Sequence, residues 1–364
     1  MGDWQSVIVS WKHACKFTKL SYNNKLRLQK GNHMMCKRIV AAAALLVGAS
    51  VVQAADISPA VIFDMGGKFD KSFNQGVYDG VEKFKSESGI EYREFEVTNE
   101  AQREQALRRM AQRGANPILS IGFAQAGPLE IVAKEFPDTS FTIIDGVVDL
   151  PNVRSVVFKE HEGSFLVGML AAMASEGDPV GFVGGMDIPL IRRFACGFQQ
   201  GAKHADPTTT VIENMTGTTP SAWNDPGRGS ELAKGQFDKG VEVIYAAAGG
   251  TGTGVYQAAK DSGKLAIGVD SNQNYLHPGT MLSSMLKRVD VAAYNTFADA
   301  QNGTWTPGME VLGLAEEGVG WALDVHNEAM ITAEMKSALE DASAKIVAGD
   351  LKVHDYMSDN ACTY

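Results

Sequence analysis

The sequence predicts an α/β protein with two lobes, each built on a parallel β-sheet. From Pro59 onward, short apolar runs alternate with segments of helical period, which is the pattern of βαβ units. A strongly apolar helix interrupts this alternation, which then begins again and indicates a second lobe on the same plan. The length of 364 residues also suits two domains of ordinary size better than one.

Residues 34–55 have the pattern of a signal peptide. Two basic residues precede an apolar run at 39–52, and small residues follow at a typical signal-peptidase site. The run of about 14 residues is shorter than the roughly 20 that a spanning helix needs. Cys36 lies before the run, so no lipid anchor is expected. We predict export to the periplasm, with residues 1–33 as an extension upstream of the signal.

The rest of the chain is strongly acidic. Without residues 1–55 it keeps 25 basic and 42 acidic side chains, which gives a formal net charge of −17. Such a charge argues against binding to nucleic acid or to an anionic membrane surface. We expect an exported monomer.

Two series of strands and helices follow in order. In the first, strands are predicted at 60–64, 92–97, 118–121, 141–145 and 153–158, with helices at 72–86, 100–113 and 127–135. A helix at 162–175 with a wide apolar stripe leads to the second series. Its strands are predicted at 180–184, 210–215, 241–247, 265–269 and 281–286. The chain ends with a helix at 290–301, β segments at 310–314 and 320–323, and a helix at 332–348.

The segment 61–75 predicts a strand, a glycine turn and the start of a helix. Apolar residues recur along the helix at spacings of three and four, which is the period of a buried face. Asp70 and Ser72 are both candidates for the N-cap, and Ser72 with Gln75 fits a capping box.

Three side chains of this segment lie where open α/β sheets bind ligands. Ligands sit at the rim formed by the carboxyl ends of the strands, and Asp64, Phe73 and Asn74 are predicted at that rim. There, a carboxylate, an aromatic face and an amide could meet one small molecule. The alternative interpretation is structural, with Asp64 capping a turn and Phe73 in the core.

The second series offers a comparable set of residues. The glycine cluster 249–254 follows an apolar run and opens a helix, so its backbone could approach a ligand closely, although it matches neither a dinucleotide fingerprint nor a Walker A motif. Asp270 and Lys287 follow strands, where a carboxylate can accept hydrogen bonds from a diol and an ammonium can donate. Trp223 is a large aromatic in a polar loop. Taken singly, each also fits a tight turn, a surface charge or a packing contact.

The sequence contains no recognisable catalytic motif. Gly-x-Ser-x-Gly, His-Glu-x-x-His and Cys-x-x-Cys are absent, and the histidines after residue 55 are scattered without ligand spacing. We therefore expect neither an enzyme nor a metal or cofactor site. Cys196 and Cys362 are the two cysteines after residue 55, and in an oxidising compartment they could form a disulfide, with two free thiols as the alternative.

Residues 64–75, Asp-Met-Gly-Gly-Lys-Phe-Asp-Lys-Ser-Phe-Asn-Gln, carry a family resemblance. They resemble the opening signature of the basic membrane protein (BMP) family, the purine nucleoside receptor-like substrate-binding proteins of ABC importers. The resemblance covers nearly all of the chain after the signal peptide. It includes, in order, segments at 141–145, 162–166, 224–229, 248–252, 267–273 and 284–290.

The resemblance implies a type I periplasmic binding fold, with two Rossmann-like lobes, a ligand cleft between them and three crossovers. The crossovers are expected near 158–160, 287–290 and 318–321. Lobe 1 would then comprise 56–159 with 288–319, and lobe 2 would comprise 160–287 with 320–364. Hinge closure would present the liganded form to a permease in the inner membrane.

The resemblance also implies a ligand, a purine nucleoside such as adenosine, guanosine or inosine. Phe73 and Trp223 would sandwich the base, although the family commonly has phenylalanine where Trp223 stands. The remaining positions match those that hold the base edge (Asp64, Asn74 and Asp145) and the ribose (Asp270, Lys287 and a backbone group near Gly250). Two alternatives stay open: another flat heterocycle such as riboflavin, and an exported enzyme that acts on nucleosides.

Overall fold

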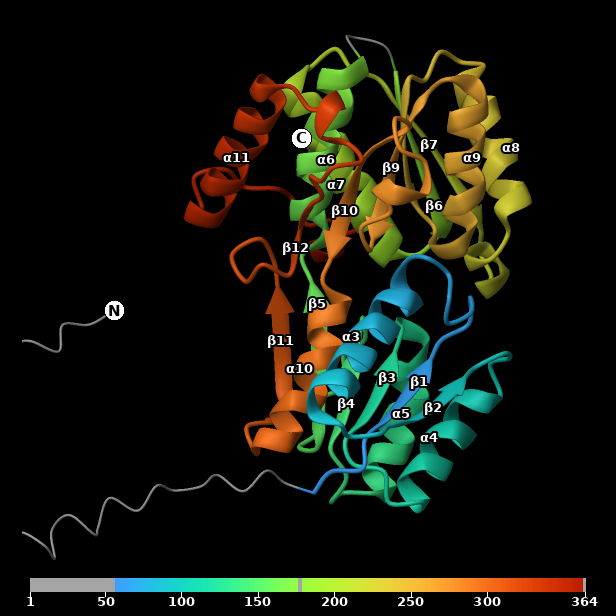
Figure 1. Cartoon of the computed structure of the whole chain (residues 1–364), viewed down its shortest axis with the longest axis vertical. Helices are drawn as coiled ribbons and strands as arrows, with labels where there is room; N and C mark the ends of the chain where they lie inside the picture. Colours follow the sequence, from blue (N-terminus) through green and yellow to red (C-terminus); the bar gives the residue numbers. More distant parts are fainter. Residues whose placement is uncertain (1–55, 176–178, 363–364) are drawn as a thin grey trace, which may run out of the picture. The chain divides into compact units, whose positions relative to one another are not determined.

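The computed structural model describes residues 56–175 and 179–362 (Figure 1). The predicted signal peptide and the upstream extension lie outside these residues. Among the helices that are described, none is long and apolar enough to cross a membrane.

The first of two six-stranded sheets is entirely parallel, with the strand order β11-β5-β4-β3-β1-β2. Its strands are β1 (Ala60–Phe63), β2 (Arg93–Glu96), β3 (Ile118–Ile121), β4 (Phe141–Ile144), β5 (Val153–Phe158) and β11 (Gly308–Leu312). Alternate residues of β1 pack into two different hydrophobic clusters, one on each face. The central strands therefore read as continuous apolar runs because helices cover both faces of the sheet.

The second sheet has the order β12-β10-β9-β8-β6-β7 and is parallel except for β12, which pairs antiparallel with β10. Its strands are β6 (Val180–Met186), β7 (Val211–Gly217), β8 (Val243–Ala247), β9 (Leu265–Asp270), β10 (Met281–Lys287) and β12 (Val319–Trp321). The strand order repeats that of the first sheet, so the prediction of two lobes on one plan is confirmed.

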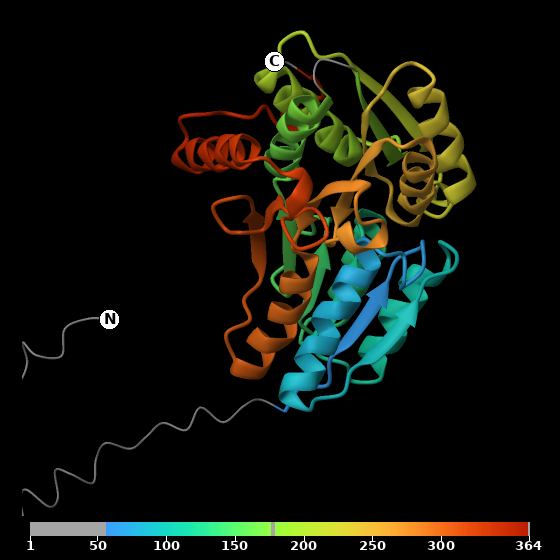
Figure 2. The same ribbon diagram turned by 45° about the horizontal axis from the view of Figure 1, so that its top comes forward.

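Helices flank each sheet on both sides (Figures 1 and 2). Around the first sheet they are α3 (Phe73–Ser88), α4 (Gln102–Gln112), α5 (Ala126–Glu135) and α10 (Val289–Asn302). Around the second they are α6 (Glu160–Ser175), α7 (Pro189–Ala205), α8 (Pro226–Phe237), α9 (Gly252–Ser262) and α11 (Ala333–Ala348). Helices α7 and α8 were not predicted from the sequence. In α7 the signal was present, because Ile191, Phe194 and Phe198 recur at helical spacing and are buried.

The chain passes between the two sheets three times. The first passage lies between β5 and α6, the second between β10 and α10, and the third between β11 and β12. The first two fall at 158–160 and 287–289, where the resemblance placed them. The third lies at 312–319, so it begins before the expected range of 318–321 and overlaps it only at 318–319. A disulfide joins Cys196 of α7 to Cys362, which is one of the two alternatives that the sequence left open for these cysteines.

Candidate ligand-binding site

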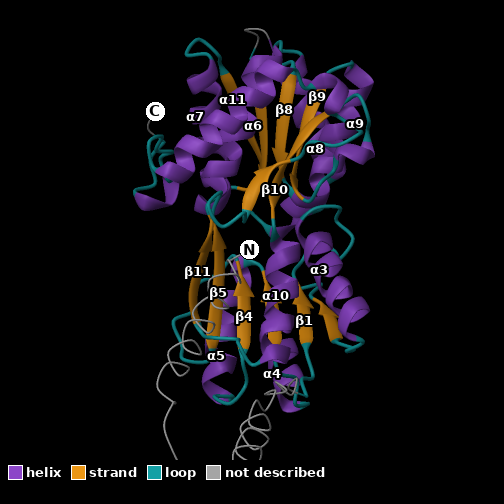
Figure 3. Ribbon diagram, turned by 60° about the vertical axis from the view of Figure 1, so that its left-hand side comes forward, coloured by secondary structure: helices purple, strands orange, loops and turns teal. Residues whose placement is uncertain are grey.

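A cavity lies between the two lobes, at the carboxyl ends of both sheets, whose strands point toward one another (Figure 3). Seven of the eight predicted site residues line it: Asp64, Phe73, Asn74, Asp145, Trp223, Asp270 and Lys287. Gly250 does not line the cavity, but its neighbour Gly249 does. The cavity is also lined by residues that were not predicted as part of the site: Met65, Asp70, Gly122, Phe123, Leu190, Ile191, Phe194, Ala247 and Val269. Three of these belong to α7, the helix that was not predicted.

Asp70, not Ser72, caps the first turn of α3. Its carboxylate accepts hydrogen bonds from the backbone N–H groups of Ser72, Asn74 and Gln75 at 2.8, 3.0 and 3.1 Å. The Ser72 side chain makes no capping hydrogen bond, so the predicted capping box is wrong. Because Asp70 already satisfies these donors, the Ser72 hydroxyl is free to donate to Asp270 of the other lobe, with an O–O distance of 2.5 Å.

Asn74 has a fixed amide orientation. Its Oδ1 accepts from the backbone N–H of Asp64 at 3.2 Å, and its Nδ2 donates to Asp70 Oδ2 at 3.1 Å. The backbone N–H needs an acceptor and the carboxylate needs a donor, so the two partners exclude the flipped amide. None of the described residues accepts from the second N–H of the amide, which can therefore donate to a ligand.

Asp64 forms a buried pair with Arg103 of α4, with 3.2 Å between Oδ1 and Nη2. Burial raises the pKa of Asp64, while a backbone hydrogen bond and the guanidinium of Arg103 oppose the rise. Gly122 packs directly on this carboxylate, since a Cβ there would lie 2.4 Å from Asp64 Oδ2. Backbone and cation together hold the carboxylate in place at the wall of the cavity.

Two lining aspartates, Asp145 and Asp270, have left-handed backbones, with φ of 66° and 64°. Asp145 Oδ2 accepts from Lys287 Nζ at 2.6 Å, and its Oδ1 is buried with no hydrogen-bond donor among the described residues. Asp270 Oδ2 accepts from Ser72, and none of the described residues donates to its Oδ1. Burial raises the pKa of Asp270 to about 7, although Lys287 and the Ser72 hydroxyl act in the opposite direction.

Each lobe supplies an aromatic ring to the cavity. Phe73 is the first residue of α3, and the Lys287 ammonium lies 5.3 Å from its ring centroid. Trp223 ends the short 3₁₀ helix Pro220–Trp223 and packs against the core of the second lobe. Its indole lies on Gly185, where any Cβ would come within 2.1 Å of the ring. Contacts with Gly185 and with the core of the second lobe therefore fix the position of the Trp223 side chain in this polar loop.

The described residues contain no group of three or more His, Cys, Asp or Glu side chains that could hold a metal ion. The cavity instead combines aromatic rings, carboxylates, one amide and one ammonium. Such a set can stack on a flat ring system and exchange hydrogen bonds with a polar ligand.

Two α/β lobes with a cavity between the ends of their sheets define the type I fold of ABC transporter substrate-binding proteins. Residues 57–356 match the Bmp family model, described as ABC transporter substrate-binding protein PnrA-like. The chain belongs to this family, as the sequence resemblance indicated.

The chain is also similar to individual proteins and to a solved structure. The chain is 35% identical over 285 residues to an uncharacterized lipoprotein of Pyrococcus abyssi, covering 75% of this chain and 70% of that protein. It is 28% identical over 357 residues to the ABC transporter nucleoside-binding protein BmpA of Lactococcus lactis, covering 88% and 99%. A solute-binding protein of an ABC transporter from Aeropyrum pernix has a similar structure, with a TM-score of 0.76, 28% identity and coverage of 82% and 93%.

Proposed function

We propose that this protein is the periplasmic substrate-binding component of an ABC importer and that it binds a purine nucleoside without altering it. One observation carries the proposal: a single cavity brings together an aromatic ring from each lobe, the Asp270 carboxylate and the Lys287 ammonium. The rings suit a base, and the charged pair suits the hydroxyls of a ribose. A relative named as nucleoside-binding supports the choice of ligand.

The base would lie between Phe73 and Trp223. Stacking on an aromatic face is worth about 1–3 kcal/mol per base and tolerates any base. Selectivity would come from the base edge, where Asp64 offers an acceptor and the free N–H of Asn74 offers a donor. A purine edge carries both complementary groups, so it can satisfy the two side chains together.

The ribose would lie between Asp270 and Lys287. Asp270 Oδ1 receives no hydrogen bond from the described residues, so it can accept from a ribose hydroxyl. The Lys287 ammonium has three N–H groups; one donates to Asp145, and its nitrogen lies 2.9 Å from Glu160 Oε1. With these two carboxylates as partners, one N–H group is left to donate to a ligand oxygen. A ligand without hydroxyls would leave these buried groups unpaired, so nucleosides are expected to bind more tightly than free bases.

A ligand screen tests the proposal. Thermal unfolding of the purified protein is followed with adenosine, guanosine, inosine, cytidine, uridine, adenine and riboflavin. A ligand at 100 times its Kd stabilises by about 2.7 kcal/mol, so purine nucleosides should raise the Tm by several degrees. A shift with riboflavin alone, or with no compound, would overturn the choice of ligand.

A separate experiment tests the alternative that the protein is an enzyme acting on nucleosides. Inosine is incubated with the protein for many hours and the mixture is separated by chromatography. We expect inosine to be recovered intact. Free hypoxanthine, at a level that follows the protein concentration, would show that the protein cleaves its ligand.

A further inference from the structure

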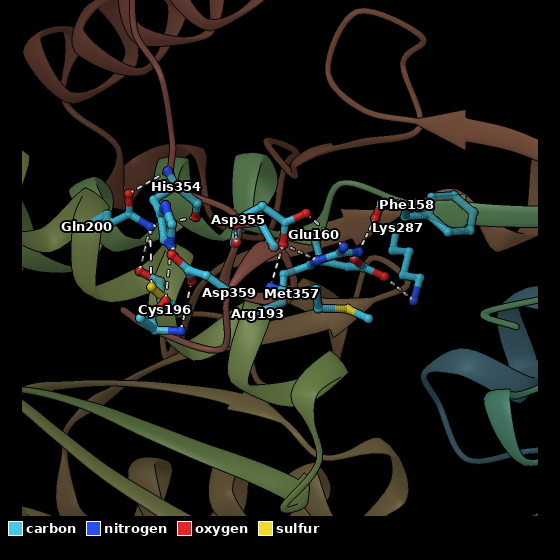
Figure 4. A network of polar contacts seen from close by, with 12 residues as sticks. Phe158, Glu160, Arg193, Cys196, Gln200, Lys287, His354, Asp355, Met357 and Asp359 are labelled. Carbon is cyan, nitrogen blue, oxygen red and sulfur yellow. Dashed lines mark hydrogen bonds and ion pairs between the residues drawn. The ribbon is translucent and has the colours of Figure 1, made fainter. Parts of the chain in front are cut away.

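A series of ion pairs leads from the cavity to the C-terminal segment (Figure 4). Lys287 Nζ lies 2.9 Å from Glu160 Oε1, and Glu160 Oε2 accepts from Arg193 Nη1 at 2.9 Å. Arg193 then binds Asp355 with both arms of its guanidinium, Nε to Oδ1 at 2.7 Å and Nη2 to Oδ2 at 2.9 Å. Lys287 lines the cavity, whereas the other three residues do not.

The four residues come from four different parts of the fold. Lys287 ends β10, Glu160 begins α6 directly after the first passage between the lobes, and Arg193 lies in α7. Asp355 belongs to the segment after α11 and caps its short 3₁₀ helix. The series therefore ties the passage between the lobes, where hinge motion is expected in this fold, to the end of the chain.

The C-terminal segment is fastened to α7 on both sides of Asp355. On one side, Gln200 donates to the backbone carbonyl of His354 at 2.9 Å and accepts from its N–H at 2.7 Å. On the other side, the disulfide joins Cys362 to Cys196, one turn along the helix from Arg193. These attachments hold Asp355 opposite the Arg193 guanidinium.

The orientation of the buried Glu160 carboxylate helps to set the position of the Lys287 ammonium. Its side chain is 0% exposed and that of Lys287 is 2% exposed, so both charges depend on their partners for stability. Arg193 binds Oε2 and also donates to the carbonyl of Phe158 at 2.8 Å, which fixes the rotation of the carboxylate. The other oxygen, Oε1, then faces the ammonium. Because Asp145 draws the same ammonium from the first lobe, the position of Lys287 is set by two opposing carboxylates.

We propose that Glu160, Arg193 and Asp355 are positioning residues that hold the Lys287 ammonium in place for the ligand, and that the Cys196–Cys362 disulfide secures the outer end of this series. The role of Lys287 at the ribose rests on the function proposed above. The inference adds that the C-terminal segment, which does not line the cavity, contributes to affinity for the ribose part of a nucleoside.

Isothermal titration with guanosine and with guanine tests the proposal on two variants, Asp355→Asn and the double variant Cys196→Ala/Cys362→Ala. Changes at residues that couple to a site without touching its ligand typically alter affinity by roughly 2- to 30-fold. We expect a loss in this range for guanosine and no change for guanine, because only the ribose is proposed to meet Lys287. Equal losses for both compounds would indicate a general structural defect and would overturn the proposal.

A matched control involves the preceding residue of the same helix. Arg192 binds Asp187 through the same two-armed contact, at 2.7 and 2.8 Å, but neither side chain lines the cavity or pairs with a side chain of the series. Asp187→Asn removes the same charge from the same kind of pair. It should leave guanosine affinity unchanged, and a loss equal to that of Asp355→Asn would overturn the proposal.

A second measurement needs no ligand. The ¹⁵N resonance of the Lys287 ammonium is assigned by its disappearance in Lys287→Met and is then compared between wild type and Asp355→Asn without nucleoside. We expect a shift of this resonance in Asp355→Asn and none in Asp187→Asn. If the wild type binds no nucleoside, the proposed function is wrong. The resonance still tests whether Asp355 influences the Lys287 ammonium, because it is measured without a ligand. An unmoved resonance together with unchanged guanosine affinity would refute the inference.

Discussion

Each lobe places an aspartate at an equivalent position in the cavity, but the two carboxylates have different hydrogen-bond partners. Asp145 follows β4 and Asp270 ends β9, and these strands occupy corresponding positions in their sheets. Both residues have positive φ, and both line the cavity. Asp145 is bound to the Lys287 ammonium at 2.6 Å, whereas Asp270 accepts from the neutral Ser72 hydroxyl at 2.5 Å.

The comparison shows that the same left-handed backbone conformation occurs with two different side-chain partners. A left-handed conformation at a residue other than glycine costs on the order of 1–3 kcal/mol and is typical of functional sites. In both lobes it directs a carboxylate away from its strand. The partners differ: Asp145 is bound to a protein cation and Asp270 to a neutral hydroxyl, while the other oxygen of each carboxylate receives no hydrogen bond from the described residues. Burial raises the pKa of Asp270 to about 7.

Removing the cation should have the largest effect. Lys287→Met leaves Asp145 and Glu160 buried without their shared ammonium, and breaking a buried ion pair typically costs about 3–5 kcal/mol. We expect a loss of this size in the free energy of unfolding, measured by urea denaturation at pH 7.5. The double variant Lys287→Met/Asp145→Asn should recover part of it. An unchanged urea midpoint would show that Asp145 does not need its cation.

Asp270→Asn should affect binding and stability in opposite directions. The amide keeps the shape but loses the charge that accepts from a ribose hydroxyl, and hydrogen bonds to charged groups contribute about 1.5–3 kcal/mol. Guanosine affinity should therefore fall by about 10- to 200-fold in calorimetric titration. At pH 8 the variant should unfold at a higher temperature than wild type, since ionisation of the buried carboxylate no longer destabilises the fold. A lower Tm would contradict the burial argument.

Affinity should also depend on pH through Asp270. Its pKa is raised from 3.8 to about 7, so the folded protein binds this proton more tightly than the unfolded chain. The stability that this proton confers is present at low pH and is lost as the pH rises through about 7. A ribose hydroxyl donates best to the ionised form, so guanosine affinity should fall at most about tenfold per pH unit below 7. Asp64 and Asp145 also have raised pKa values, so Asp270→Asn serves as the control and should flatten the profile between pH 5.5 and 8.

Most of the polar and charged residues that line this cavity could be predicted from the sequence, because strand ends and glycine turns are local features. Asp64, Asp270 and Lys287 follow or end apolar runs, and in parallel sheets those ends meet at one edge. The partners of these groups could not be predicted, because they are set by tertiary contacts. Ser72 is 198 residues from Asp270, and Lys287 is 142 residues from Asp145.

Two local details could not be predicted for the same kind of reason. The capping box at Ser72 failed because Asp70, two residues earlier, competes for the same backbone donors. Gly249 lines the cavity in place of Gly250 because the turn after β8 decides which of two adjacent glycines faces the ligand. Sequence patterns locate such a turn, but not the direction of each residue within it.

Each lobe also contributes an aromatic ring, and a conservative change of one ring should have the smallest effect on guanosine affinity. Trp223→Phe keeps a ring face for stacking but removes part of the contact area, so guanosine affinity should fall by less than the about 1–3 kcal/mol that base stacking contributes. Trp223→Ala should lose that full amount. The indole also packs on Gly185, so a structural role competes with stacking. If Trp223→Phe binds as weakly as Trp223→Ala while both remain folded, packing on Gly185 is the main role of the indole, and Phe73 of the first lobe is then the principal stacking surface.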